Sequence, residues 1–158
     1  MSTRLANAGR LVNKNKAVSF TFNGKNLRGF EGDTLASALL ANDQMMVGRS
    51  FKYHRPRGVV ASGAEEPNGL VNLGKDNTFE PNQRITTTEL FDGLTATSQN
   101  HWPSLEFDVG VINTYFSRFM PAGFYYKMFI HPRPFWKHIY EPMIRQAAGL
   151  GKAPKDRD

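Results

Sequence analysis

The side chains with the most chemical potential lie in one short stretch, residues 48–70, which reads GRSFKYHRPRGVVASGAEEPNGL. Its first half gathers basic side chains around two aromatic rings: Arg49, Lys52, His54, Arg55 and Arg57, with Phe51 and Tyr53. Guanidinium groups bind carboxylates and phosphates through paired hydrogen bonds. This half of the stretch therefore predicts contact with an anionic group, on a ligand or on an acidic surface.

The second half of the stretch turns to small residues followed by two glutamates. Two interpretations are open for Glu65, Glu66 and Asn68. They cap the loop by accepting its backbone N–H groups, or they pair with the arginines that precede them. The sequence alone does not decide between these two roles.

Other kinds of site lack the residues that they need. The chain has no cysteine, which excludes disulfides, thiolate metal sites and cysteine catalysis. His101, His131 and His138 do not have the i, i+4 spacing with a carboxylate that suggests zinc. The sequence also has no Ser-His-Asp arrangement, Walker loop or G-x-G-x-x-G motif. Hydrolase, NTPase and self-contained dinucleotide-binding functions are therefore without support.

Composition sets the outer limits for the fold and the partners. The 158 residues suffice for one domain, or for a small domain with an appendage. The formal charge of +6 suits nucleic acid, an anionic cofactor or an acidic partner subunit. No apolar run approaches the ~18 residues of a membrane span, and residues 1–16 lack the apolar region of a secretory signal. We expect a cytoplasmic protein.

The elements that position the loop begin with a predicted hairpin and helix. Apolar residues alternate from residue 18 to 22, and Asn23-Gly24 is a dipeptide typical of a tight type I′ turn before a return strand at 25–30. Asp33 is predicted to cap a helix that ends at residues 42–43. Residues 69–74, 84–91 and 94–100 are predicted strands, with a polar loop at 72–84 between the first two. This order predicts an α+β, β-grasp domain over residues 17–100, preceded by an N-terminal arm at 1–16.

Residues 101–158 form a third region that is rich in aromatic residues. Asp108 is predicted to start a short helix with Ile112, Tyr115, Phe116 and Phe119 on one face, and Pro121 to end it. A second helix is predicted from Pro134, with a kink at Pro142 and a C-cap at Gly149, and residues 124–130 are almost wholly apolar. A small β-grasp core cannot cover all these side chains. We expect this helical extension to contact another domain or chain.

Specific motifs in this chain resemble those of one enzyme family. RSFKYHRPRG, preceded by FNGKNLRGFEGDTLASALLAND and followed by SGAEEPNGLV, is similar to the N-terminal region of the alpha subunits of heterotetrameric sarcosine oxidases. The resemblance continues through LFDGLTATSQNHWPSLEFDVGVIN, FMPAGFYYKMF and YEPMIRQAAGLGKAP, so it covers nearly the whole chain from about residue 10. In that family a nucleotide-binding domain follows directly, and the resemblance implies that the extension leads toward it.

The resemblance also implies a ferredoxin-like domain that has lost its metal. In related dehydrogenases the loop after RPRG carries a C-x4-C-x2-C pattern that holds a two-iron two-sulfur cluster. The matching positions here are Ala61, Glu66 and Gly69, with the fourth ligand near Thr86, and none of them supplies a thiolate. We expect no iron–sulfur cluster and no metal, and a filled or collapsed loop at residues 58–69. A cluster held by Glu and His is chemically poor, because such clusters select thiolate.

Two hypotheses for function follow. By resemblance, the chain is a docking portion, inactive alone, of a complex that oxidises sarcosine to glycine using FAD, FMN and NAD, with tetrahydrofolate accepting the one-carbon unit. Its partners are then the other subunits and the nucleotide-binding domain, with no cofactor bound by these residues alone and no membrane or nucleic acid partner. Arg49, Arg55 and Arg57 then face acidic subunit surface or contact a flavin or nucleotide phosphate. The alternative is a free-standing module that binds nucleic acid through its basic aromatic run.

Overall fold

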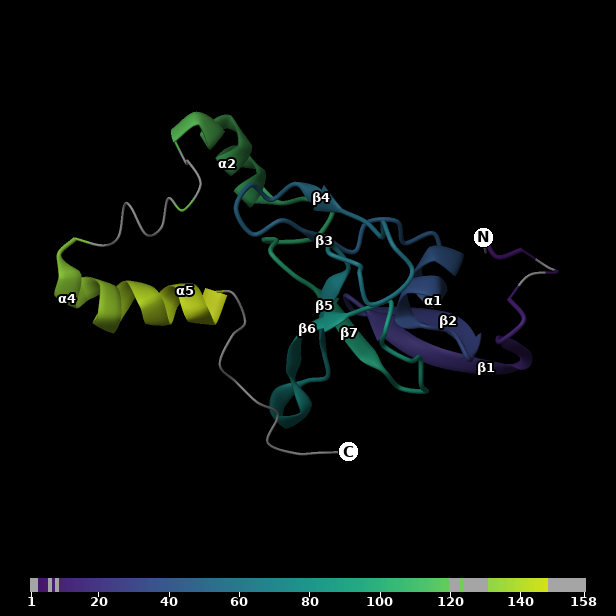
Figure 1. The fold of residues 1–158 in the computed structure, drawn as a ribbon. Helices are drawn as coiled ribbons and strands as arrows, with labels where there is room; N and C mark the ends of the chain where they lie inside the picture. The colour runs from purple at the N-terminus through teal and green to yellow at the C-terminus, as the bar shows by residue number, and fades with distance from the viewer. Residues whose placement is uncertain (1–2, 6, 8, 120–122, 124–130, 148–158) are drawn as a thin grey trace.

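The computed structural model describes residues 3–5, 7, 9–119, 123 and 131–147. A five-stranded sheet with the strand order β2-β1-β7-β5-β6 forms the body of the molecule (Figure 1). The strands of this sheet are β1 (Asn13–Phe22), β2 (Lys25–Glu31), β5 (Leu70–Leu73), β6 (Glu80–Arg84) and β7 (Thr95–Ser98). The central strands β1 and β7 are parallel, and the other neighbours are antiparallel. This mixed sheet with a helix after the first hairpin confirms the predicted α+β topology.

The β1–β2 hairpin is as the sequence predicts. Asn23 and Gly24 both have positive φ, 50° and 77°, which is what a tight turn between twisted strands requires. The turn sets the register, in which Phe22 pairs with Lys25. Val18 and Phe20 are buried on the same face of β1 as Phe22, so the alternation of apolar residues decides which face meets the core.

Helix α1 (Leu35–Ala41) has a different N-cap from the one predicted. Thr34, not Asp33, is the N-cap, because its side chain accepts from the backbone N–H of Ser37 while the Ser37 hydroxyl accepts from that of Thr34. Asp33 lies one residue earlier, where its buried carboxylate accepts from the Phe30 N–H and pairs with Arg4 at 2.6 Å. The predicted end of the helix is confirmed by the C-cap at Asn42.

The region between β5 and β7 differs from the sequence prediction. The predicted strand at 84–91 is wrong, because residues 85–88 form a turn against the start of α1. The hydroxyls of Thr87 and Thr88 both donate to the Arg84 carbonyl, a local bond that competes with sheet pairing. The edge strand β6 instead lies inside the predicted polar loop, together with the short 3₁₀ helix η1 (Asp76–Thr78).

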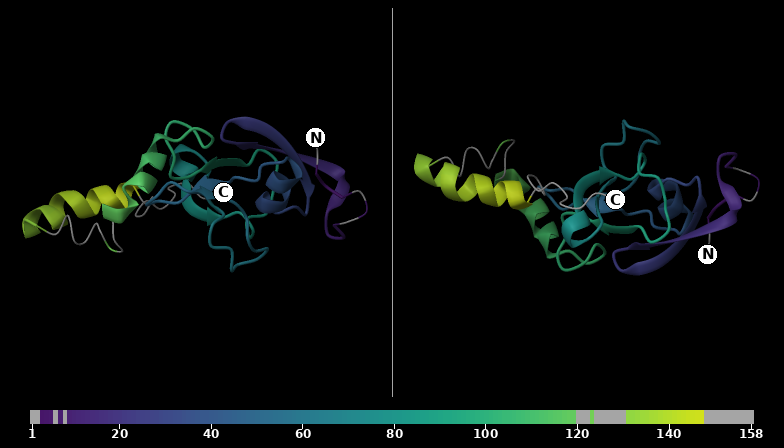
Figure 2. Two further views of the ribbon diagram at one scale, coloured as in Figure 1. Left: turned by 90° about the horizontal axis from the view of Figure 1, so that it is seen from above. Right: turned by 90° about the horizontal axis from the view of Figure 1, so that it is seen from below.

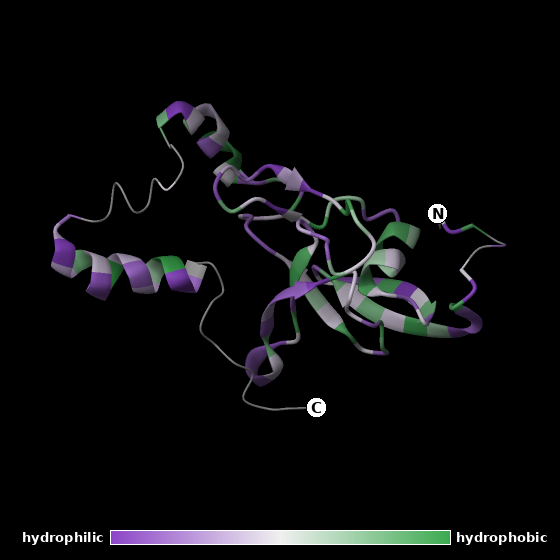
Figure 3. Cartoon of the chain, viewed as in Figure 1, coloured by the Kyte–Doolittle hydropathy of each residue, from purple (hydrophilic) through white to green (hydrophobic). Residues whose placement is uncertain are grey.

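The core lies between the sheet and α1. Its largest buried side chains come from elements that are distant in sequence, and they include Phe20, Phe22, Leu35, Leu39, Val71 and Ile85. Figure 3 shows hydrophobic residues along α1 and the strands next to it. At ~25 cal/mol per Å² of buried apolar area, this cluster supplies most of the driving force for folding the domain.

Short helices follow the sheet. They are, in chain order, the 3₁₀ helix η2 (Val109–Val111), the α-helix α2 (Ile112–Tyr115) and the 3₁₀ helix η3 (Ser117–Phe119). The N-cap predicted at Asp108 is confirmed, since its carboxylate accepts from the Gly110 N–H. The predictions for Pro121, residues 124–130 and Gly149 lie outside the described residues.

A second helical segment comprises α4 (Arg133–Phe135), the π-helical turn η4 (Trp136–Tyr140) and α5 (Glu141–Ala147). It begins where the sequence predicts. The π turn ends two residues before the proline at position 142, as is common where the regular hydrogen-bond ladder is interrupted. Figures 1 and 2 show this segment beyond one end of the sheet. In the part of the chain that the structure describes, no helix is long and apolar enough to cross a membrane.

Candidate functional site

The basic run folds into a small hairpin next to the sheet. Strands β3 (Gly48–Arg49) and β4 (Pro56–Arg57) pair antiparallel, so that Gly48 faces Arg57. Ser50 closes the turn between them, because its N–H donates to the Arg55 carbonyl and its carbonyl accepts from the His54 N–H. His54 takes a positive φ of 54° in this turn, a conformation that non-glycine residues adopt infrequently. The hairpin thus presents the basic side chains in different directions.

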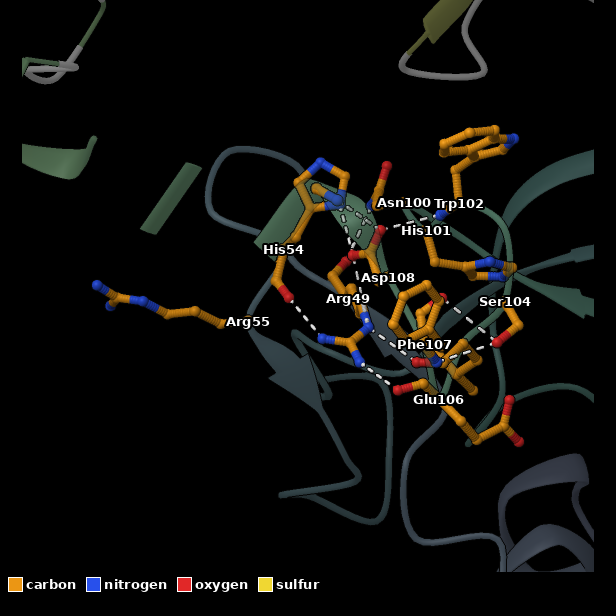
Figure 4. A network of polar contacts seen from close by, with 12 residues as sticks. Arg49, His54, Arg55, Asn100, His101, Trp102, Ser104, Glu106, Phe107 and Asp108 are labelled. Carbon is orange, nitrogen blue, oxygen red and sulfur yellow. Dashed lines mark hydrogen bonds and ion pairs between the residues drawn. The ribbon is translucent and has the colours of Figure 1, made fainter. Parts of the chain in front are cut away.

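Arg49 is directed inward and forms the centre of a polar network (Figure 4). Only 8% of its surface is exposed. Its guanidinium donates to three backbone carbonyls, those of Leu105, His54 and Glu106, at 2.8, 2.9 and 3.2 Å. A planar group with fixed donors suits such a cluster of carbonyls better than a lysine would. Arg49 therefore ties the hairpin to residues 105–106, more than fifty positions later.

Asp108 is the counter-charge of this network. Its side chain is fully buried and lies 3.5 Å from Arg49 Nε, while His54 Nδ1 binds the same carboxylate oxygen at 2.7 Å. The other oxygen accepts from the N–H groups of Trp102 and Gly110. Burial acts to raise the pKa of Asp108, but the hydrogen bonds from Trp102, Gly110 and His54 outweigh it and lower that pKa. The carboxylate stays charged and holds both ends of the 102–110 segment.

Arg55 and Arg57 lie on the surface of the hairpin, away from this network. The Arg55 guanidinium stacks over the Tyr53 ring at 4.8 Å, and Figure 4 shows it pointing away from Arg49. Arg57 donates to the Asn68 side chain at 2.6 Å. The three arginines are therefore not brought together. Since the donors of Arg49 are directed at carbonyls, the predicted phosphate contact depends on Arg55 and Arg57.

The loop at residues 58–69 is organised around one buried carboxylate. Glu66 is completely buried. One of its oxygens accepts from the N–H groups of Val60 and Ala61 at 2.7 and 2.6 Å. The other accepts from the N–H groups of Asn68 and Gly69 at 2.7 and 3.1 Å. Of the two roles left open for Glu66, the structure shows the loop cap, whereas Asn68 pairs with Arg57.

These hydrogen bonds make the pKa of Glu66 lower than that of an ordinary glutamate. Burial acts in the opposite direction and raises it, but the four backbone N–H groups outweigh burial. The neighbouring Glu65 makes a much weaker contribution to the loop, because it accepts only from the Gly63 N–H at 3.1 Å and lies at the surface. The loop therefore has one charged centre, and that centre is Glu66.

The four positions matched to cluster ligands do come together around this loop. Ala61 and Gly69 both bind the Glu66 carboxylate, and the Thr86 hydroxyl donates to the Gly63 carbonyl, which also accepts from the Glu66 N–H. Their chemistry does not fit an iron–sulfur cluster, since a methyl, a carboxylate, a hydrogen and a hydroxyl replace four thiolates. A side chain at Gly69 would also collide with Ile85, 2.8 Å from the added Cβ. Within the described residues, no group of three His, Asp or Glu is placed to hold a metal ion.

Comparison with family models assigns the chain to a family. A family model described as "2Fe-2S iron-sulfur cluster binding domain" matches residues 15–101, which is more than half of the sequence. The chain therefore belongs to this ferredoxin-like family, although it has no cysteine.

Comparison with curated proteins gives the particular relatives. The chain is 59% identical over 157 residues to sarcosine oxidase subunit alpha of Rhizobium meliloti, covering 99% of this chain and 16% of the relative. It is 41% identical over 93 residues to the subunit of the same name from Corynebacterium sp. strain U-96, covering 57% of this chain and 10% of that relative. The chain thus spans less than a fifth of the length of either relative.

Comparison with solved structures finds L-proline dehydrogenase from P. horikoshii. The two are 25% identical in sequence, with a TM-score of 0.43. The match covers 59% of this chain and 18% of that one.

Sequence analysis missed the role of Asp108, whereas the loop cap found for Glu66 is one of the two roles that it left open. Asp108 was predicted only as a helix start, and its pairing with Arg49 and His54 had no signal in the sequence, since the partners lie more than fifty positions apart. A signal did exist for Glu66, because the sequence resemblance matches position 66 to a cluster ligand.

Proposed function

We propose that this chain is the docking part of the alpha subunit of a multi-subunit, flavin-dependent sarcosine oxidase, and that it has no activity alone. The observation that carries the proposal is the 59% identity over 99% of the chain to a sarcosine oxidase alpha subunit. The complex would oxidise sarcosine to glycine with FAD, FMN and NAD bound, oxygen as electron acceptor and tetrahydrofolate as acceptor of the one-carbon unit. The nucleic-acid alternative gains no support from the relatives.

The proposed domain works without an iron–sulfur cluster. Two observations support this: the sequence has no cysteine, and the Glu66 carboxylate fills the centre of the loop where the family has its ligands. Soft iron–sulfur clusters need thiolate ligands. The loop is then a structural element and does not carry electrons between flavins.

The helices after the sheet are proposed to dock on the rest of the assembly, which includes the other subunits and a nucleotide-binding domain. Two observations support this proposal. The segment exposes large apolar side chains, and Asp108 anchors its start to the hairpin. Tyr115 is 82% exposed and Phe119 is 72% exposed. Aromatic side chains of this size contribute heavily to interfaces when a partner covers them.

The basic hairpin has two proposed roles that the relatives do not separate. Arg55 and Arg57 face an acidic surface of another subunit, or they contact the phosphate of a flavin or nucleotide. The cytoplasmic location expected from the sequence also stays a prediction.

Purification of the natural complex through a tag on this chain tests the proposed function. We expect co-purifying subunits, bound flavin, oxygen uptake that depends on sarcosine and not on glycine, and no stoichiometric iron with labile sulfide. Tyr115→Ser with Phe119→Ser should reduce recovery of the partners, whereas Leu11→Ser, equally exposed in the N-terminal arm at 83%, should not. A flavin-free protein that binds nucleic acid with a steep salt dependence would support the alternative instead.

A further inference from the structure

The amide groups around Glu66 form a site built for an anion. Four N–H groups converge on one carboxylate from two segments, Val60 with Ala61 and Asn68 with Gly69. The two segments lie on opposite sides of the loop in sequence, so the carboxylate closes the loop by binding both. Hydrogen bonds to a charged acceptor are stronger than those between neutral groups. The loop's shape therefore depends on a negative charge at its centre.

No cationic side chain shares this centre in the part of the chain that the structure describes. The ion pairs found there do not include Glu66. Arg84 donates to the backbone carbonyl of Glu66 and not to its carboxylate, and Arg57 binds the Asn68 side chain. The neighbouring Glu65 lies at the surface and carries a charge of the same sign as Glu66. Backbone dipoles alone thus compensate the buried carboxylate.

An iron–sulfur cluster with its thiolates is also an anion that accepts hydrogen bonds at sulfur. The family model that covers residues 15–101 is described as a domain that binds such a cluster. The sequence resemblance places Ala61, Glu66 and Gly69 at ligand positions of that loop. Here the N–H groups of two of these positions bind the side chain of the third. The loop of this chain therefore encloses a carboxylate as its anion, where the family description names a cluster.

We propose that the Glu66 carboxylate is a built-in replacement for the anionic cluster and that it organises the loop at residues 58–69 through the same amide cradle. The loop then reaches its folded shape without iron, and it holds the basic hairpin and Thr86 in place permanently. This inference rests on the proposed absence of the cluster. It goes further by assigning an anion site, specific for a carboxylate, to this chain.

Chemical rescue of Glu66→Ala in the 158-residue chain tests the anion site. This change removes a fragment with the shape of acetate, so acetate fits the vacated cradle, and acetamide is a neutral probe of nearly the same shape. We expect the variant to lose at least about 5 °C in Tm. Acetate should restore at least half of that loss, whereas acetamide and sodium chloride of equal ionic strength should not.

The matched control is Glu65→Ala, which removes a glutamate from the same loop that accepts from a single N–H group. This variant should change Tm little and gain nothing from acetate. Amide exchange gives a second readout, because the N–H groups of residues 60, 61, 68 and 69 should exchange about tenfold faster or more in Glu66→Ala and slow again in acetate. If Glu66→Ala does not fold, refolding in acetate and not in acetamide provides the same discrimination.

The outcomes separate this inference from the proposal on which it rests. Two outcomes would show that Glu66 fills space and is not the anion bound by the amides. One is equal recovery of Tm in acetate and in acetamide, and the other is no recovery of Tm together with unchanged amide exchange. Anaerobic treatment of the wild-type chain with iron and sulfide is the separate test of the absent cluster. A stoichiometric chromophore there would overturn the cluster-free domain, whatever the result of the rescue.

Discussion

Replacing Asp108 with asparagine is the sharpest test of the network that ties the 102–110 segment to the basic hairpin. Asparagine keeps an oxygen that accepts from the Trp102 and Gly110 N–H groups. Its amide group, however, faces Arg49 Nε, so that a donor meets a donor, and His54 Nδ1 accepts from this amide only in the tautomer that carries the proton on Nε2. Arg49, which is 8% exposed, then loses the one counter-charge that it has among the described residues. Removing one partner of a buried ion pair costs about 3–5 kcal/mol.

Thermal and urea unfolding of the 158-residue chain measure this effect. With ~3 kcal/mol at the lower end of that range, and about 2–4 °C per kcal/mol for a chain of this size, Tm should fall by about 10 °C. A double-mutant cycle with Arg49→Met should give a coupling of about 1–3 kcal/mol. Glu106→Gln is the control, because its pair with Lys25 is exposed and contributes at most about 1 kcal/mol. If Asp108→Asn costs no more than Glu106→Gln, the network does not anchor the segment.

Two further predictions concern the helix cap and the dependence on pH. Thr34→Ala removes the hydroxyl that caps α1 and should lower the free energy of unfolding by about 1 kcal/mol in urea titrations, and an unchanged midpoint would contradict the assigned cap. The folded-state pKa values of Glu66 and Asp108 lie below their unfolded values, so their stabilisation is complete only above about pH 5, and it is lost as pH falls through the folded pKa values. Unfolding free energies measured between neutral pH and about pH 2 should therefore fall steeply in acid, and Asp108→Asn should flatten that fall. A variant with the same acid slope as wild type would show that Asp108 is not one of the groups responsible.

Local signals in the sequence are enough to predict several elements of the fold. Asn23-Gly24 has the backbone preference of a tight turn, and the alternation around Phe20 marks the buried face of β1. Helix α1 and strand β5 lie where apolar periodicity and flanking glycines predict them. The missing cysteines exclude thiolate ligands whatever the fold, because that exclusion depends on composition alone. The gathering of Ala61, Glu66, Gly69 and Thr86 was predictable only through the resemblance to a family.

The roles of the buried polar groups could not be predicted from local signals, because their partners come from distant segments or from backbone amides that a sequence does not display. Asp33 has the right chemistry for an N-cap, but its pairing with Arg4 and the Phe30 N–H leaves the cap to Thr34. Residues 85–88 have β-branched side chains, yet their threonine hydroxyls and their contact with α1 favour a turn. In the sequence Glu66 is one polar loop residue among several, whereas in the folded structure it is buried and forms the charged centre of the loop. A buried carboxylate must have its hydrogen bonds satisfied, and only the folded loop brings four N–H groups to it.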